Sequence, residues 1–394
     1  MGLTILYSAG QTDVPTSVAE IWRRQFVWVC VGLIACIFAF RLSPRLLEWA
    51  TPFLYGAAIV LLLVTLVVGV GAGTAAGTKS WIAIAGVRLG QPAEFAKLAT
   101  ILMLAKMLGE RRHPPASVME ALPFCLVAAV PFVLIGLQPD LGSAIVFVTL
   151  LFAALYWGGV RPSLLLLLAS PVISLLLAFS SISWGIWIVF LTLFLLWMRP
   201  FVVEGVVVWF VNVVMGVGAL GLWQQLEPYQ QNRLLSFLNP EIDPRATGWH
   251  IIQSKIAIGS GGLLGEGFTA GTQKRLAFLP AQHTDFVYSV VGEELGFLGV
   301  LVTLALLGFL ILTLIKIARN TSDPYSSIFV FGAAGMVLTH VLVNVGMTVG
   351  LMPITGIPLP FFSYGGSFLI ICMVIMGLAL RVEWESRGTW SETF

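Results

Sequence analysis

Residues 259–294 read GSGGLLGEGFTAGTQKRLAFLPAQHTDFVYSVVGEE, and residues 346–367 read GMTVGLMPITGIPLPFFSYGGS. Both stretches are rich in glycine, proline or polar residues, and both adjoin long apolar segments. Irregular, charged segments are costly at a membrane boundary, and they are kept there for polar chemistry. We therefore expect apolar helices over most of the chain and the functional residues in these two polar stretches.

The rest of the chain is dominated by apolar residues. Of its 394 residues, 58% are hydrophobic and only 10% are charged, which is too few to cover the surface of a soluble protein of this size. The net charge of +2 gives no indication of nucleic-acid binding, and the four cysteines lie in apolar runs without metal-ligand spacing. The composition predicts an all-α, polytopic integral membrane protein, and no cleavable signal peptide is recognisable.

Eleven apolar runs match membrane-crossing helices, each of which needs about 20 residues. An apolar stub at residues 1–8 is too short to cross alone, and the run 286–317 is longer than one crossing needs. We expect a single membrane domain over 1–394, with helices in 1–223, an extracytoplasmic loop at 224–285 and further helices in 286–381. The predicted spans are 26–40, 53–70, 92–108, 122–137, 143–156, 163–179, 184–198, 202–223, 286–317, 328–349 and 368–380.

Lysine and arginine predict the orientation, because they accumulate in short cytoplasmic loops. If the N-terminus is cytoplasmic and the stub completes a crossing, the cytoplasmic side holds eleven such residues and the short outer loops hold four. The loop 224–285 then faces outward, and the two stretches quoted above share one face. The eleven are Arg41, Arg45, Lys106, Arg111, Arg112, Arg161, Arg199, Lys316, Arg319, Arg381 and Arg387, against Arg23, Arg24, Lys79 and Arg88.

Asp285 lies where the outer loop becomes an apolar helix. One interpretation is a helix cap, because Asp and the preceding Thr284 both satisfy free backbone N–H groups at helix starts. The other is a general base in a half-dry site. Glu293 and Glu294 follow about 12 Å along the same helix, at a depth where at least one should face the protein interior.

The glycines of 259–271 permit tight turns, which can present N–H groups to an anion such as a phosphate. A flexible loop is the alternative, and the nearby pair Lys274 and Arg275 favours the functional interpretation.

Other polar residues within the apolar runs could have a functional role or a purely structural one. Glu94 and Lys97 share a helix face and could form an internal ion pair, and Asp140 could cap the helix that follows it. His340 and Asn344 also share a face, which favours hydrogen bonds between helices. The small residues 332–335 permit close helix packing, either with a partner protein or within this chain.

The motifs together resemble the SEDS family, which includes RodA, FtsW and SpoVE, over nearly the whole chain. The loop sequences are more similar to those of its elongation member than to those of its division member. The matching segments are QPAEFAK (91–97), QPDLG (138–142), FLNPE (237–241), QSKIAIGSGG (253–262), GTQ (271–273), FLP (278–280), HTDF (283–286), GEELG (292–296), PLP (358–360) and SYGG (363–366).

This resemblance implies a peptidoglycan glycosyltransferase of the bacterial inner (cytoplasmic) membrane. Such a protein polymerises lipid II, the undecaprenyl-linked disaccharide-peptide, into a glycan strand on the outer face. It works with a class B penicillin-binding protein, a transpeptidase, within the elongation machinery. The essential acid of the family falls on Asp285, its intramembrane polar pair on Glu94 and Lys97, and its QPDLG acid on Asp140.

Glycosyl transfer needs a base for the acceptor hydroxyl and positive charge for the departing diphosphate. Asp285 is the expected catalytic residue, either as that base or as a ligand of a divalent cation such as Mg²⁺ or Mn²⁺. No organic cofactor is implied. The expected substrate-binding residues are Glu94, Lys97, Asp140, Arg88, Lys274, Arg275 and Ser363.

Three departures from the family pattern are visible. The family usually has ten spans, whereas 163–223 holds three apolar runs where one is expected, which predicts an extra hairpin of unassigned role. The motif LYSA comes already at 6–9, which leaves open whether the N-terminus is complete. Arg88 lies three residues before Gln91 instead of two, which puts its phosphate contact in doubt.

Three alternatives remain: a lipid II flippase, a division-specific polymerase and a scaffold for the transpeptidase. A flippase needs a polar path reachable from both sides of the membrane. The acids of this chain cluster on the predicted outer side, which favours the polymerase.

Overall fold

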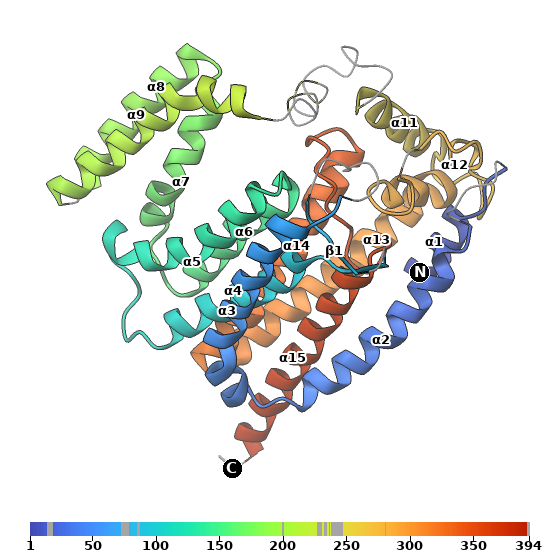
Figure 1. Cartoon of the computed structure of the whole chain (residues 1–394), viewed down its shortest axis with the longest axis horizontal. Helices are drawn as coiled ribbons and strands as arrows, with labels where there is room; N and C mark the ends of the chain where they lie inside the picture. The colour runs from blue at the N-terminus through green and yellow to red at the C-terminus, as the bar shows by residue number, and fades with distance from the viewer. Residues whose placement is uncertain are drawn as a thin grey trace.

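The computed structural model describes residues 1–13, 19–71, 79–84, 87–198, 201–226, 247–279 and 281–391, together with residues 231, 235 and 237. Helices dominate, and one two-stranded antiparallel sheet, β1 (Ile82–Ile84) with β2 (Val87–Gly90), precedes α4. The helices are α1 Gly2–Ala9, α2 Ile21–Arg41, α3 Pro44–Val68, α4 Pro92–Gly109, α5 Val118–Gly136, α6 Leu141–Trp157, α7 Pro162–Leu177, α8 Ser181–Met198, α9 Val202–Gln225, α11 Thr247–Ser260, α12 Thr272–Arg275, α13 Val287–Asn320, α14 Pro324–Thr348 and α15 Gly366–Ser391 (Figure 1).

Each of the eleven predicted spans falls on one of these helices. Within the described residues, eight helices are long and apolar enough to cross a membrane, and α6 and α7 are shorter apolar helices. The remaining span is α4, which carries three charged residues. The predicted all-α, polytopic membrane fold is therefore confirmed.

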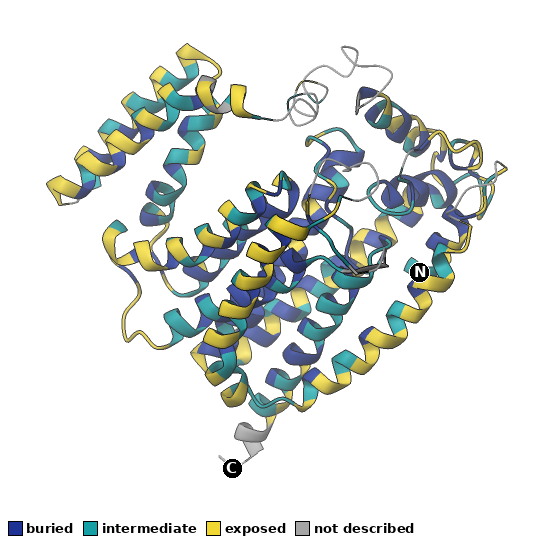
Figure 2. Ribbon diagram, in the orientation of Figure 1, coloured by how far each residue is buried: buried dark blue, intermediate teal, exposed yellow. Residues whose placement is uncertain are grey.

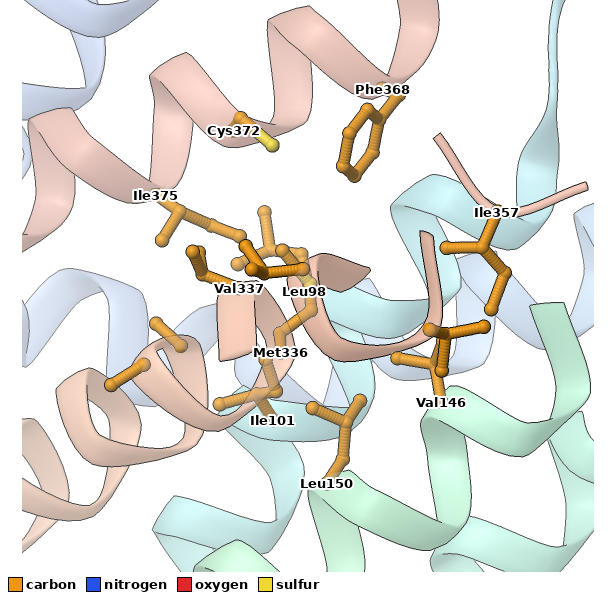
Figure 3. Close-up of a cluster of buried hydrophobic side chains, with 14 of the residues drawn as sticks. Leu98, Ile101, Val146, Leu150, Met336, Val337, Ile357, Phe368, Cys372 and Ile375 are labelled. Atoms are coloured by element: carbon orange, nitrogen blue, oxygen red, sulfur yellow. The ribbon is translucent and has the colours of Figure 1, made fainter. Parts of the chain in front are cut away.

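The centre of the molecule is formed by α4, α6, α14 and α15. Figure 3 shows their apolar side chains converging, together with Ile357 from the segment between α14 and α15. Helix α14 is the most enclosed of the candidate spans, and 67% of the residues in its most apolar stretch are buried. By contrast, α2 and α3 expose large apolar side chains along most of their length (Figure 2), as helices that face lipid do.

Helices α7, α8 and α9 form a peripheral unit beside this centre (Figure 1). The unit has its own small apolar cluster, separate from the main core. Asn212 of α9 joins the three helices, because its side chain donates to Ser170 of α7 at 2.8 Å and accepts from Trp187 of α8 at 3.3 Å. Helices α7, α8 and α9 thus correspond to the three apolar runs of 163–223, where the extra hairpin is predicted, and α8 and α9 both pack on α7.

The small residues at 332–335 pack within this chain. A Cβ added at Gly332 would lie 2.9 Å from Ile101 of α4, and one added at Gly335 would lie 2.9 Å from the Cβ of Ala153 in α6. Gly332, Ala333 and Ala334 are all buried. Of the two interpretations of this stretch, the structure supports close packing of α14 on α4 and α6.

We expect Gly335→Leu to destabilise the isolated protein, because α6 presents a backbone-attached methyl group that cannot rotate away. Overpacking of this kind costs about 1–3 kcal/mol, and a thermal unfolding scan in detergent would show it as a lower midpoint. Gly308→Leu in α13 is the matched control, since nothing lies within 4 Å of a Cβ at that position. Equal midpoints for the two variants would contradict this packing.

Candidate active site

The two polar stretches, 259–294 and 346–367, are joined by hydrogen bonds. Ser363 donates its hydroxyl to the carbonyl oxygen of Thr284 at 2.5 Å, and the amide of Tyr364 donates to the carbonyl oxygen of His283 at 2.8 Å. Ser363 is buried, and its hydroxyl also accepts the amide of Leu359 at 2.8 Å. The segment after α14 therefore determines where the residues just before α13 lie.

Asn344 of α14 forms hydrogen bonds with the same two segments. Its side-chain amide donates to the carbonyl oxygen of Asp285 at 3.1 Å and to that of Ile357 at 2.8 Å. Asn344 is completely buried, so these bonds form where water does not compete. The predicted hydrogen bonding by Asn344 is present, but it reaches the irregular segments rather than the flank of another helix.

Asp285 is half-buried and lies one residue before Phe286, the N-cap of α13. Its amide donates to the carbonyl oxygen of Ala281 at 3.1 Å, across a turn in which Ala281 has φ of 50°. Burial lowers the pKa of the neighbouring His283, which favours its neutral form. The carboxyl group of Asp285 thus belongs to a turn whose backbone is fixed on several sides.

Glu94 and Lys97 form the predicted ion pair, with 2.8 Å between Lys97 Nζ and Glu94 Oε1, and both side chains are almost completely enclosed. Lys97 Nζ also lies 3.3 Å from His340 Nε2, and His340 Nδ1 lies 3.0 Å from the carbonyl oxygen of Pro358. An ammonium can only donate and a carbonyl can only accept, so His340 is the neutral tautomer with its proton on Nδ1. The pair therefore supports the segment that faces Asp285.

Asp140 joins the starts of three helices. One carboxylate oxygen accepts the amide of Ser143 at 3.0 Å, as predicted for a cap of α6, and the other accepts the side chain of Gln91 at 3.0 Å. Gln91 is the N-cap of α4, and its backbone N–H donates to the Ser367 hydroxyl in the first turn of α15 at 3.2 Å. Asp140 thus combines the capping role with a contact to the QPAEFAK motif.

The glycine-rich loop packs against a break in α13. Gly296 has non-helical dihedral angles, with φ of 62° and ψ of −163°. The carbonyl oxygens of Glu293 and Glu294 accept the amides of Glu266 and Gly267 at 2.9 and 3.1 Å. Below the break, the amides of 297 and 298 donate to the carbonyl oxygens of 262 and 263 at 2.9 and 3.2 Å. The glycines of this loop allow backbone to approach backbone, which neither sequence interpretation anticipated.

Lys274 is completely enclosed and lies with Glu294 and Ser8. Its ammonium is 2.6 Å from Glu294 Oε1 and 3.1 Å from the Ser8 hydroxyl, and Ser8 donates to the same carboxylate at 2.5 Å. Glu293 accepts the amides of Gln273 and Lys274 at 2.6 and 3.3 Å. Glu293 and Glu294 both face the interior, and the sequence predicted this for at least one of them.

Arg275 pairs with Asp13 at 2.9 Å, and both side chains are about half exposed. The side chain of Arg88 lies outside the described residues, although its backbone belongs to β2. The structure therefore brings Ser363 to the Asp285 turn and connects Glu94 and Lys97 to it through His340. Lys274 and Arg275 contact the N-terminal segment instead.

Sequence reasoning missed Ser8, because nothing in residues 1–8 marks one serine as the partner of a lysine 266 positions away. Among the residues that the structure describes, no group of three or more His, Cys, Asp or Glu side chains is placed to hold a metal ion. The divalent cation thus stays a prediction.

Sequence comparison identifies relatives along the whole chain. The family of cell cycle proteins comprising FtsW, RodA and SpoVE matches residues 1–189 and 172–388. The peptidoglycan glycosyltransferase RodA of Treponema pallidum is 33% identical, over 97% of this chain and 94% of its own length. The peptidoglycan glycosyltransferase MrdB of Escherichia coli is 32% identical over 96% and 88%, and a probable FtsW of Geobacter metallireducens is 34% identical over 98% and 92%.

Solved structures agree with these relatives. A chain from a peptidoglycan synthase complex that coordinates polymerization and crosslinking matches with a TM-score of 0.70 and 30% identity, over 98% of this chain and 95% of that one. The rod shape determining protein RodA of Thermus thermophilus matches with a TM-score of 0.61 and 29% identity, over 98% and 92%. The resemblance seen in the motifs is thereby confirmed, and the chain belongs to the FtsW, RodA and SpoVE family, the SEDS family.

Proposed function

We propose that this chain is a peptidoglycan glycosyltransferase that polymerises lipid II into glycan strands during cell-wall elongation, with Asp285 as its catalytic residue. The names of its relatives support the activity. The observation that carries the residue assignment is the turn before α13. Its half-buried Asp285 carboxyl group stands on a backbone whose carbonyl oxygens accept hydrogen bonds from Asn344, Ser363 and Tyr364.

The reaction forms a glycosidic bond and releases a lipid-linked diphosphate. The Asp285 carboxylate takes the proton of the acceptor hydroxyl while the oxygen of that hydroxyl bonds to the anomeric carbon of the donor sugar. The bond between that carbon and the diphosphate oxygen breaks, and the electron pair leaves with the diphosphate. The alternative role for the same carboxyl group would be to hold a divalent cation, which would supply positive charge for the departing diphosphate.

Rigid placement matters because a misplacement of about 1 Å can reduce the rate of such a step about 10²-fold. Ser363 and Asn344 fix the backbone on either side of Asp285. Glu94, Lys97 and His340 hold Pro358, the neighbour of Ile357, and thereby support the same segment. Glu94 and Lys97 are proposed to serve substrate binding through this segment, since both are enclosed.

The proposed setting is the bacterial inner membrane, with the N-terminus in the cytoplasm and the Asp285 turn outside. The proposed partner is a class B penicillin-binding protein that crosslinks the new strands. A matching solved chain comes from a complex that joins polymerization to crosslinking, and this supports a transpeptidase partner.

We expect Asp285→Asn to abolish polymerisation of lipid II by the purified protein with its partner. Asn keeps the shape and the capping ability of Asp but cannot take a proton, and loss of a general base typically costs about 10²–10⁴ in rate. The measurement is the length distribution of glycan strands on a gel, together with thermal stability and co-purification of the partner, which should both stay normal.

Asp323→Asn is the matched control. Asp323 is the N-cap of α14, where its side chain accepts the amide of Ser326 at 3.0 Å, and Asn caps a helix equally well. This variant should polymerise at the parent rate. An Asp285→Asn protein with near-parent activity would sink the assignment and leave only a structural role for this residue.

The proposed orientation is tested by labelling Ala270→Cys in a variant that lacks the four native cysteines. Ala270 is exposed, so an impermeant thiol reagent should label it in intact spheroplasts. His113→Cys, in an exposed loop predicted to be cytoplasmic, should react only after permeabilisation. The reverse pattern would overturn the orientation.

A further inference from the structure

The first part of α13 is a separate helical section. Its residues 287–295 lie between the Asp285 turn and the break at Gly296, a length of about 13 Å. Because the helix is kinked there, the direction of this section depends on its own contacts as well as on the rest of α13. One end carries Asp285, and the other carries Glu293 and Glu294.

The Glu294 end is held by an enclosed ion pair. Lys274 and Glu294 have no exposed side-chain surface, and Nζ is 2.6 Å from Oε1. Ser8 of α1 completes the group, with contacts to both partners at 2.5 and 3.1 Å. If one partner is removed, an uncompensated charge stays buried, whereas neutralising both is tolerated far better.

The N-terminal segment also contacts the loop at two points between Lys274 and the Asp285 turn. The side chain of Gln282 donates to the carbonyl oxygen of Ala9 at 2.8 Å, and Asp13 pairs with Arg275 at 2.9 Å. Lys274 therefore lies between α1, the loop that leads to Asp285 and the far end of the helical section that starts after Asp285. Its ammonium, enclosed with these partners, does not reach a substrate surface.

We propose that Lys274 is a positioning residue, which with Ser8 and Glu294 sets the direction of residues 287–295 and thereby the position of the Asp285 carboxyl group. This inference rests on the proposed function, in which Asp285 is catalytic. It replaces the sequence-based expectation that Lys274 binds the diphosphate. The α1 helix thus becomes part of the support of the active site.

The test uses Lys274→Met in the full-length protein with its partner and lipid II as substrate. A positioning role predicts that kcat falls by about 10²-fold, as for small misplacements of catalytic groups, while KM for lipid II stays unchanged. Direct diphosphate binding predicts a higher KM. A purely structural role predicts a lower unfolding midpoint with normal kcat per folded molecule. Either of the last two results would overturn the inference.

The double variant Lys274→Met with Glu294→Gln gives an independent test, which holds even if the single variant folds poorly. In the single variant the unpaired Glu294 carboxylate displaces residues 287–295. Removing both charges leaves no unpaired ion to do so, and we therefore expect most of the lost kcat to return. If Lys274 contacted the diphosphate, a change at Glu294 could not restore activity, and a double variant as slow as Lys274→Met would overturn the inference.

Lys316→Met is the matched control, since Lys316 lies exposed near the other end of α13, and its kcat should equal that of the parent. A parent protein that does not polymerise lipid II at all would count against the proposed function itself. An active parent with an unrestored double variant would count only against the role of Lys274.

Discussion

The arrangement of this protein depends on one constraint: polar groups withdrawn from water among apolar helices must find partners within the chain. The break in α13 frees backbone groups, and the glycine-rich loop supplies their partners at 266, 267, 262 and 263. The irregular segment after α14 is satisfied in the same way by Asn344, His340 and Ser363. At these two irregular segments, other parts of the chain supply most of the hydrogen-bond partners that a regular helix would have supplied.

This constraint explains why the turn that carries Asp285 is so well defined in a peptidoglycan glycosyltransferase whose substrate is large and partly lipid. Thr284 and Asp285 do not depend on substrate for their backbone geometry, because their carbonyl oxygens already accept from Ser363 and Asn344. Pre-formed geometry of this kind lowers the reorganisation that the chemical step requires. The apolar core beneath the site, where α4, α6, α14 and α15 meet (Figure 3), keeps those donors in place.

Much of this could be predicted from the sequence. Apolar runs gave all eleven spans, and local spacing predicted the Glu94–Lys97 pair and the Asp140 cap, because each depends on residues a few positions apart. The sequence placed the two polar stretches on one face, but most individual contacts between distant segments could not be predicted. Nothing in the sequence shows that Ser8 meets Lys274, or that the glycines of 261–267 serve a helix break some 30 positions later. A glycine chosen for a tight turn and one chosen for close approach look alike in a single sequence.

The break at Gly296 has a consequence for how the enzyme sits in its bilayer. A lipid-embedded helix tilts or shifts when membrane thickness changes, and an unbroken α13 would carry that movement straight to Asp285. Here the glycine-rich loop is hydrogen-bonded on both sides of the break, to 293 and 294 above it and to 297 and 298 below it, so both sections of α13 are tied to the same loop. The break is therefore a braced kink and not a free hinge: a change in membrane thickness acts on the loop and on both sections of α13 together, rather than on the Asp285 turn alone.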